Sequence, residues 1–302
     1  MKAWILGTRG STLALTQTQW VRLRLAQKFP GQKFEVRIIK TLGDSKSTLL
    51  AEELPSKGIF TRRIEEALLA KEIDIAVHSL KDLPVELPAG LLLGPVPLRE
   101  DARDVLVSLD NKTLAKLRKR ARIGTGSSRR KLQLLIERPD LDVVAIRGNV
   151  QTRVKRVARG GLDAVVLARA GLRRLGLENR IAEIFEPERM LPAVGQGALA
   201  IEIRQSDQDA LDLIEAVGDP DSTDSVRAER AFLGALGGGC RVPIGGTARC
   251  DKGKLTIWGG VFSPDGTRNF RGMLSGDSKD AQALGEKLAG QLMAQGAKEV
   301  LV

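Results

Sequence analysis

One cysteine stands in an unusual glycine-rich stretch. Cys240 follows three glycines, and the stretch continues to Ile244 as GGGCRVPI. Consecutive glycines give a loop with little steric bulk that can approach a ligand closely. A nucleophilic or attachment role is therefore plausible for Cys240, whereas Cys250 is expected to be a small buried hydrophobe. No histidine lies nearby in the sequence, so a Cys–His hydrolase is not indicated.

A second stretch that could do chemistry covers residues 78–84, HSLKDLP. Asp82 beside Lys81 is either a lone acid aimed into a cleft or half of a surface ion pair, which is the commoner fate of such residues. His78, the only histidine, invites a catalytic role, but a core histidine satisfied by hydrogen bonds is the more common outcome. The residues alone leave both questions open.

Arginines follow three successive predicted strands. Residues 124–130, GTGSSRR, lie between a strand and a helix, where backbone N–H groups, hydroxyls and two guanidinium groups can converge on an anion. Arg147 and Arg153 follow the next strand, and residues 169–174 follow the third. The spacing matches neither a P-loop nor GxGxxG. Two interpretations fit these residues: an anion site that binds carboxylates through guanidinium groups, or a capped helix with solvated arginines.

The charge of the chain is concentrated in its middle third. The net charge of the 302 residues is +11, but residues 112–180 hold 19 Lys and Arg against five Asp and Glu. An anionic partner is expected to meet this segment, and both nucleic acid and a small polycarboxylate are candidates. Only 3% of the residues are aromatic, which weakens a proposal of base stacking.

Several classes of protein are disfavoured by composition. The N-terminal apolar run is too short for a signal peptide, and no apolar run approaches the roughly 20 residues that cross a bilayer. Two cysteines cannot build a disulfide framework, so a reducing cytosol is the simplest compartment. One His and two Cys also argue against a thiolate or imidazole metal site. Composition leaves a carboxylate-only site for a hard cation open, but we expect no metal.

The first two-thirds of the chain alternate short β-rich runs with helical stretches. Such alternation predicts parallel sheets with helices on both faces. The predicted strands cover residues 3–6, 34–40, 73–77, 122–123, 143–146, 164–168 and 199–203, the last returning to the first sheet. The predicted helices cover residues 12–28, 60–70, 127–137 and 150–159, with Ser11 capping the first.

The last part of the chain has a different pattern. Residues 223–236 predict a helix, and residues 242–250, 254–262 and 267–274 predict three strands with meander spacing. A final helix is predicted at 279–294. This pattern is typical of a small α+β domain with an antiparallel sheet.

Together these stretches resemble the porphobilinogen deaminase family, in the family's order and over nearly the whole chain. The matching segments are residues 7–15 (GTRGSTLAL), 41–44 (TLGD), 57–60 (KGIF), 78–84 (HSLKDLP), 99–104 (REDARD), 147–149 (RGN), 192–198 (PAVGQGA) and 238–245 (GGCRVPIG). Two positions depart from the family pattern: Gly126 stands where the family has a hydroxyl residue, and Gly237 where an acidic residue is common.

The resemblance implies an α/β fold of two type II periplasmic-binding-protein-like domains with a cleft between them, plus a small α+β domain with a three-stranded antiparallel sheet. The first domain would comprise residues 1–98 and 198–217, the second residues 103–193, and the third residues 220–302. The third would carry the attachment cysteine.

The resemblance also implies the activity. Four porphobilinogen molecules would be condensed head to tail, each losing ammonia, on a dipyrromethane primer joined to Cys240 by a thioether. The product would be the linear tetrapyrrole hydroxymethylbilane. Asp82 would be the catalytic carboxylate, because loss of ammonia leaves a cation that a nearby negative charge stabilises.

The family motifs further assign ligand-binding residues. Those expected to hold the dipyrromethane cofactor, besides Cys240, are Ser79, Lys81, Asp82, Thr125, Ser127, Arg129 and Arg130. Those expected to bind substrate are Arg9, Ser11, Lys57, Phe60, Arg147, Arg153, Arg174 and Gln196. Porphobilinogen would be the partner, with no nucleic acid and no membrane, and the enzyme would be a cytoplasmic monomer.

Two other functions fit parts of the pattern. A solute-binding module would share two α/β domains and bind an anion without chemistry, but the loop of Cys240 has no purpose in it. A nucleic-acid-binding protein would use the basic segment, but its arginines fall at strand ends and no recognition motif is present.

Overall fold

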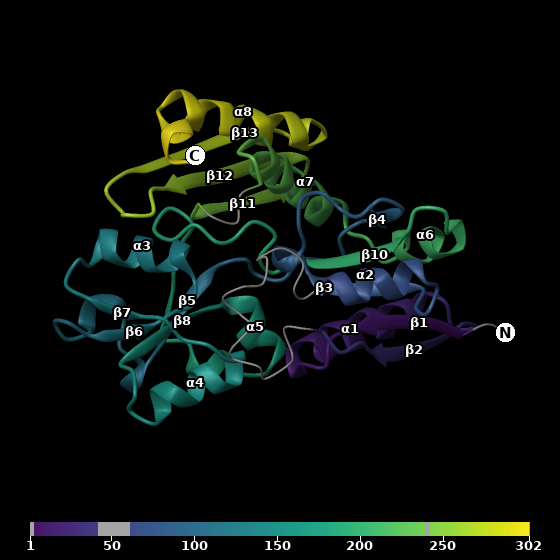
Figure 1. Ribbon diagram of the computed structural model, residues 1–302, viewed down its shortest axis with the longest axis horizontal. Helices are drawn as coiled ribbons and strands as arrows, with labels where there is room; N and C mark the ends of the chain where they lie inside the picture. The colour runs from purple at the N-terminus through teal and green to yellow at the C-terminus, as the bar shows by residue number, and fades with distance from the viewer. Residues whose placement is uncertain (1–2, 42–60, 239–241, 302) are drawn as a thin grey trace. The chain divides into compact units, whose positions relative to one another are not determined.

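The chain forms two compact units, each built from separate stretches of sequence. The computed structural model describes residues 3–41, 61–238 and 242–301 (Figure 1). The first unit comprises residues 1–99 and 198–223, and the second comprises residues 100–197 and 224–302.

The first unit is an α/β structure around one five-stranded sheet with the order β2-β1-β3-β10-β4. Its strands are β1 (Ala3–Thr8), β2 (Lys33–Ile38), β3 (Ile75–Ser79), β4 (Leu91–Leu93) and β10 (Leu199–Arg204). Its helices are α1 (Thr12–Lys28), α2 (Arg62–Leu69), the 3-10 turn η2 (Leu80–Asp82) and α6 (Gln208–Glu215).

This sheet is mixed, so the prediction of a parallel sheet holds for only part of it. Strands β1, β2 and β3 pair in parallel, but β10 runs antiparallel to β3 and β4, with Leu199 opposite Ser79. Helical crossovers enforce parallel pairing, and β10 enters the sheet without one. The prediction that residues 199–203 return to the first sheet is confirmed.

The second unit contains a similar five-stranded sheet with the order β7-β6-β8-β5-β9. Its strands are β5 (Asp104–Ser108), β6 (Arg122–Gly124), β7 (Asp142–Val144), β8 (Ala164–Ala168) and β9 (Glu183–Ile184). Its helices are α3 (Ser128–Glu137), α4 (Val150–Ala158) and α5 (Arg169–Arg174), with 3-10 turns η3 (Leu109–Asn111), η4 (Leu114–Lys116) and η5 (Glu178–Arg180). Strand β5, which the sequence did not predict, is fully buried and antiparallel to β8.

A three-stranded antiparallel sheet completes the second unit, as predicted. Its strands are β11 (Ile244–Asp251), β12 (Lys254–Phe262) and β13 (Asn269–Asp277). Its helices are α7 (Pro220–Ala235) and α8 (Ala281–Ala294), with 3-10 turns η6 (Ser278–Asp280) and η7 (Ala297–Val300). Helix α7 begins just before the unit boundary at residue 223. Lys252 and Gly253, both with positive φ, make the tight turn between β11 and β12. The division into three domains stays a prediction.

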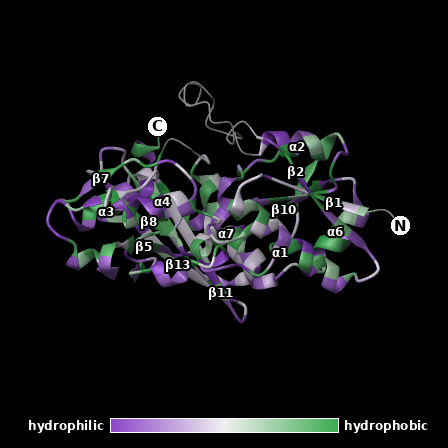
Figure 2. Cartoon of the chain, turned by 90° about the horizontal axis from the view of Figure 1, so that it is seen from below, coloured by the Kyte–Doolittle hydropathy of each residue, from purple (hydrophilic) through white to green (hydrophobic). Residues whose placement is uncertain are grey.

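Hydrophobic clusters lie between the sheets and their helices. In the first unit Leu6, Val21, Leu25 and Ile201 belong to one such cluster. Figure 2 shows that helices such as α1 and α2 carry both hydrophobic and hydrophilic residues, the pattern of helices that cover a sheet. Among the described residues, no helix has the length and apolarity that a bilayer crossing requires.

Candidate active site

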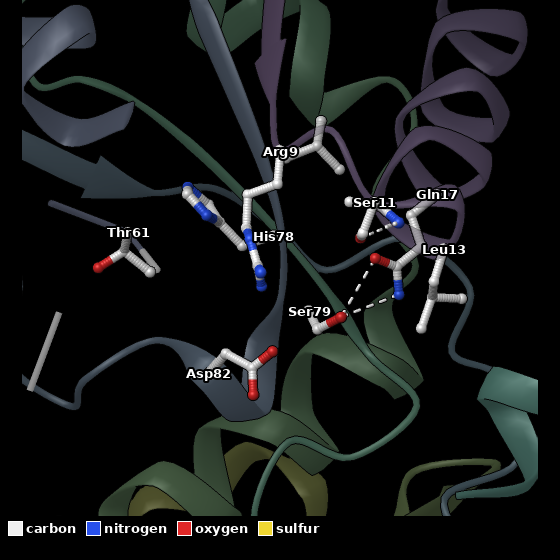
Figure 3. Close-up of a pocket in the computed structure, with 10 residues that line it drawn as sticks. Arg9, Ser11, Leu13, Gln17, Thr61, His78, Ser79 and Asp82 are labelled. Carbon is white, nitrogen blue, oxygen red and sulfur yellow. Dashed lines mark hydrogen bonds between the residues drawn. The ribbon is translucent and has the colours of Figure 1, made fainter. Parts of the chain in front are cut away.

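A pocket in the first unit gathers polar side chains from the ends of β1 and β3. Its lining residues are Arg9, Ser11, Leu13, Ala14, Gln17, Thr61, Val77, His78, Ser79 and Asp82 (Figure 3). Four of them, Arg9, Ser11, Ser79 and Asp82, are residues that the sequence assigned to cofactor, substrate or catalysis. Ser11 also caps α1, where its hydroxyl accepts the backbone N–H of Ala14 at 3.3 Å.

Asp82 lines this pocket and is held in place by its backbone. It ends the turn η2, which buried Leu80 anchors by donating its backbone N–H to the carbonyl of Ala198. Leu83 follows and is also buried. The carboxylate of Asp82 itself is exposed, and Figure 3 shows it pointing into the same space as the guanidinium of Arg9. The side chain is therefore available to a ligand and contributes nothing to the core.

The sequence did not single out Gln17, which positions Ser79. The Gln17 side chain is buried, and its Nε2 donates to the Ser79 hydroxyl at 2.9 Å while its Oε1 lies 3.1 Å from the same hydroxyl. A polar residue on the buried face of a predicted helix was the available signal, because such a residue needs a partner. Gln17 therefore orients a hydroxyl that faces the pocket.

His78 is buried, as predicted, but it is not an ordinary hydrogen-bonded core histidine. Its Nε2 lies 3.2 Å from Oε2 of Glu202, which is completely buried, without the alignment of a hydrogen bond. Glu65 on α2 belongs to the same cluster. Burial raises the pKa of Glu65 and the Glu202 charge adds to this, although the neighbouring Thr61 hydroxyl and His78 oppose the shift.

Glu65→Gln is expected to stabilise the protein at neutral and alkaline pH. Because the pKa of Glu65 is raised in the folded state, its contribution to stability is present below the unfolded value of about 4.5 and is lost as the pH rises through the folded value. Thermal melts should show a Tm gain of a few degrees above that range and almost none below pH 4. A gain that is largest in acid would contradict this assignment.

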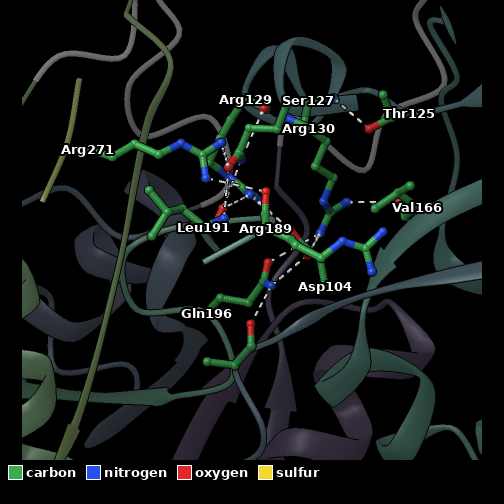
Figure 4. Close-up of polar contacts among 12 residues, drawn as sticks. Asp104, Thr125, Ser127, Arg129, Arg130, Val166, Arg189, Leu191, Gln196 and Arg271 are labelled. Atoms are coloured by element: carbon green, nitrogen blue, oxygen red, sulfur yellow. Dashed lines mark hydrogen bonds and ion pairs between the residues drawn. The ribbon is translucent and has the colours of Figure 1, made fainter. Parts of the chain in front are cut away.

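In the second unit, two arginines share one buried carboxylate (Figure 4). Nη1 of Arg129 and Nη2 of Arg130 lie 2.9 and 2.7 Å from the two oxygens of Asp104. Gln196 also donates to Asp104 at 2.7 Å, and Arg129 donates to the carbonyl of Leu191. The arginines of α3 and the Gln196 loop are thus joined through one residue of β5.

The balance of this cluster favours an additional anion. Burial by itself raises the pKa of Asp104, but the charges of Arg129 and Arg130 outweigh it and hold the pKa well below its usual range. Burial lowers the pKa of Arg129, and the charge of Arg130 adds to this while Asp104 opposes it. The buried Nε of Arg130 has no hydrogen-bond partner among the described residues. Two cations with one carboxylate leave a positive charge and an unused donor.

The predicted hydroxyls of this segment are engaged locally. Ser127 caps α3 and accepts the backbone N–H of Arg130 at 3.4 Å, and the Thr125 hydroxyl accepts the N–H of Ser127 at 3.2 Å. A Cβ at Gly126 would lie 2.9 Å from the carbonyl oxygen of Ile146. A side chain at this position would therefore require a small shift of the loop.

The remaining predicted arginines differ in exposure. Arg147 is exposed, and Arg153 is half-buried with its Nε donating to the carbonyl of Gly148 at 2.8 Å. Burial lowers the pKa of Arg153, and the charges of Arg130 and Arg156 lower it further. Arg174 is half-buried, and burial lowers its pKa to about 10. Arg153 is thus electrostatically coupled to the Asp104 cluster.

Part of the basic excess is structural, which the sequence did not reveal. Residues just before segment 112–180 supply its counter-ions: besides Asp104, Asp101 pairs with Arg169 at 2.6 Å and Glu100 with Arg173 at 3.0 Å. These acids lie within REDARD, one of the family motifs. Asp104 in particular is a site residue that sequence reasoning missed.

The remaining predicted site residues are Lys57, Phe60, Lys81 and Cys240. Lys57, Phe60 and Cys240 lie outside the described residues. Lys81 is exposed beside Asp82. Their assigned roles stay predictions.

Comparison with known proteins gives consistent matches. The family model "Porphobilinogen deaminase, dipyromethane cofactor binding domain" matches residues 4–212, and the model of the C-terminal domain of porphobilinogen deaminase matches residues 223–294. Among solved structures, the chain is similar to a putative methionine-binding lipoprotein from Bacillus subtilis, with a TM-score of 0.44 and 14% identity over 74% of this chain and 93% of that one. It is also similar to the periplasmic aliphatic sulphonate binding protein of Escherichia coli, with a TM-score of 0.43 and 14% identity over 78% of this chain and 70% of that one.

Curated relatives agree over the full length. The chain is 46% identical over 302 residues to the porphobilinogen deaminase of Brevibacillus brevis, with 100% of this chain and 97% of the relative covered. It is 47% identical to that of Thermus thermophilus, with 100% and 99% covered. It is 45% identical to that of Bacillus subtilis, with 100% and 96% covered. The chain belongs to the porphobilinogen deaminase family.

Proposed function

We propose that the chain is a hydroxymethylbilane synthase that condenses four porphobilinogen molecules, with release of ammonia, on a dipyrromethane primer attached to Cys240. Family membership supports the reaction, and the exposed carboxylate of Asp82 in a pocket of hydrogen-bond donors is the observation that carries the mechanism. We also propose that the enzyme is cytoplasmic and acts as a monomer.

The charges in the second unit fit the cofactor. A dipyrromethane bears acetate and propionate groups, and guanidinium groups bind carboxylates in two-pronged fashion. The unused Nε of Arg130 and the surplus cation of the Asp104 cluster are the features that such a carboxylate would satisfy. When bound, the dipyrromethane supplies the pyrrole carbon at which the chain is extended.

Asp82 would act electrostatically on the substrate. Loss of ammonia from porphobilinogen leaves a positive charge shared with the pyrrole nitrogen, and bond formation at carbon leaves a second cation that must lose a proton. A carboxylate near the pyrrole N–H stabilises both charges and can hold the proton. The position of Asp82 on a short turn anchored by Leu80 supports this role, because the charge is placed by a rigid backbone.

The other polar residues would bind and orient carboxylates. Arg9 and Ser11 follow β1 in the pocket of Asp82, and their side chains suit a substrate acetate or propionate. Arg147, Arg153 and Arg174 would do the same in the second unit as the polypyrrole lengthens. A porphobilinogen unit carries two carboxylates, so a chain of six pyrroles needs many such cations.

The purified protein is expected to carry a dipyrromethane adduct on Cys240 and none on Cys250. Cys250 lies on β11, where it is half-buried and not buried as the sequence predicted, and its backbone N–H donates to the Ser225 hydroxyl. Intact mass, followed by peptide mapping, measures both positions. An unmodified Cys240 in protein that still consumes porphobilinogen would show that the primer is held elsewhere.

The same sample tests the reaction. Incubation with porphobilinogen, acid oxidation and an absorbance scan should reveal uroporphyrin, the oxidation product of cyclised hydroxymethylbilane. A solute-binding module would bind porphobilinogen but would show neither the adduct nor the porphyrin spectrum.

A further inference from the structure

The pocket of Asp82 is backed by a buried cluster of three titratable side chains, Glu65, His78 and Glu202, which come from α2, β3 and β10. His78 lines the pocket (Figure 3). Glu65 and His78 are each 6% exposed, and Glu202 is 0% exposed. The cluster therefore lies between the ligand-facing wall and the interior of the first unit.

Polar atoms of this cluster are not satisfied by hydrogen bonds. Within the described part of the chain, Nε2 of His78, Oε1 of Glu65 and both carboxylate oxygens of Glu202 have no hydrogen-bond partner. Buried polar atoms in folded proteins are almost always paired. The described residues also include no group of three or more His, Cys, Asp or Glu arranged to hold a metal ion. A bound proton would lower the charge of this cluster.

The charged residues that the structure describes around the two carboxyl groups do not neutralise them. Among the described residues, His78 is the one basic group at ion-pair distance from Glu202, and no ion pair is made by Glu65. Glu66, next along α2, is turned to Arg62 at 3.0 Å. Arg9 and Asp82 face the pocket.

Strand β10 carries one further cation, and it faces elsewhere. Arg204 donates to the carbonyls of Leu68 and Ile73 and pairs with Asp74 and Asp207. With both carboxyl groups ionised and the imidazole neutral, the cluster would therefore place two negative charges at the wall of a site that receives carboxylates.

We propose that the Glu65–His78–Glu202 cluster takes up a proton when the pocket binds a carboxylate of porphobilinogen, so that these residues tune substrate affinity without taking part in bond formation. The proposal rests on the proposed function. A bound anion next to the cluster repels the cluster's negative charge and so favours uptake of a proton. By linkage, the pocket must then bind the anion more tightly when the cluster is already protonated.

The measurable consequence is a pH-dependent KM that is separate from kcat. Carboxylic acids and primary amines keep one charge between about pH 6 and 9, so the ionisation of porphobilinogen does not change over this range. In the holoenzyme, KM should rise with pH as the cluster loses its proton. The direction agrees with Glu65, whose pKa burial raises.

Steady-state kinetics of three variant holoenzymes, each compared with the parent, test the proposal. Glu65→Gln keeps the shape but removes one negative charge, so KM at pH 9 should fall about 3- to 10-fold below the parent value, with a flatter pH profile and kcat within about twofold. His78→Gln should also flatten the profile. Asp74→Asn is the matched control, because Asp74 is a buried acid in the same unit that pairs with Arg204 and accepts the N–H of Ile5. It should retain the parental slope.

Each other outcome overturns a stated claim. KM profiles of Glu65→Gln and His78→Gln that run parallel to the parent would overturn the cluster's role, as would an equal flattening in Asp74→Asn. Calorimetry with porphobilinogen in two buffers of different ionisation enthalpy measures proton uptake directly. Binding with proton uptake but no consumption would overturn the proposed function and support the coupling, whereas binding without uptake would overturn the coupling alone. Absence of binding would overturn both.

Discussion

Asp82→Asn is expected to lower kcat for porphobilinogen consumption by about two to four orders of magnitude. The substitution keeps the shape and some hydrogen bonding but removes the negative charge that faces the cationic intermediates. A pair of unit charges about 4 Å apart at an effective dielectric near 20 is worth roughly 4 kcal/mol, which corresponds to about a thousandfold in rate. Asp82→Glu keeps the charge but displaces it by one methylene, so it should retain more activity and slow every step.

Folding should survive both changes. The Asp82 side chain is exposed, and the turn that carries it is anchored by Leu80 and Leu83, which are buried. Circular dichroism and thermal melts check this point. Asp212→Asn, an exposed acid on α6 of the same unit, is the matched control and should leave kcat unchanged. An Asp82→Asn enzyme within tenfold of the parent would mean that another group stabilises the cation.

Asp104→Asn is expected to combine a large loss of stability with loss of the cofactor. It leaves the guanidinium groups of Arg129 and Arg130 buried without their carboxylate, and breaking a buried ion pair in this way costs about 3–5 kcal/mol. At roughly 2–4 °C per kcal/mol for a unit of this size, Tm should fall by about 10 °C. The freed arginines should also lose their orientation, so intact mass should show protein without the dipyrromethane adduct.

The pH dependence of this effect has a defined sign. Because the pKa of Asp104 is lowered in the folded state, its contribution is present above the unfolded value of about 3.8 and is lost as the pH falls through the folded value. The Tm difference between parent and variant should therefore hold from neutral pH to about pH 5 and shrink in stronger acid. Asp140→Asn, which breaks the exposed pair with Arg138, should change Tm little. An Asp104→Asn protein with parental Tm and full adduct would show that Asp104 is not the anchor of these arginines.

Local features of the fold followed from sequence patterns. Ser11 caps α1 as predicted, strands β8 and β12 begin and end at the predicted residues, and the turns around Gly253 and Gly266 are made where expected. Caps and turns depend on residues within a few positions of one another. A short segment of sequence is therefore enough to predict them.

The family motifs placed Asp82 in the same way. A buried strand followed by HSLKDLP puts the carboxylate at a strand end, and the structure has Asp82 three residues after β3. The shift of β3 from residues 73–77 to Ile75–Ser79 did not alter this, because the motif itself fixes the distance between strand and acid. The structure thus agrees with the predicted position of Asp82, and its catalytic role stays a prediction.

Partners distant in sequence were decided by the tertiary structure. Gln17 meets Ser79 across 62 positions, and Asp104 meets Arg129 and Arg130 across 25 and 26. These pairings depend on which strands become neighbours in a sheet. The antiparallel pairing of β5 with β8 and of β10 with β3 leaves no signal in the local pattern of hydrophobic residues. For this reason the basic middle third looked more open to a ligand than it is.

His78 combines a feature that the sequence predicts with one that only the tertiary structure decides. A core histidine satisfied by hydrogen bonds was the more common outcome for this residue; burial was found, but Nε2 has no hydrogen-bond partner among the described residues. That it would face Glu202, with Glu65 nearby, could not be predicted, because Glu202 lies on a strand that enters the sheet after a long excursion of the chain. The sequence by itself determined which chemical groups this protein carries and the short motifs that present them, since these depend on adjacent residues. Only the tertiary structure decided which charges face one another, because that depends on the order and direction of strands far apart along the chain.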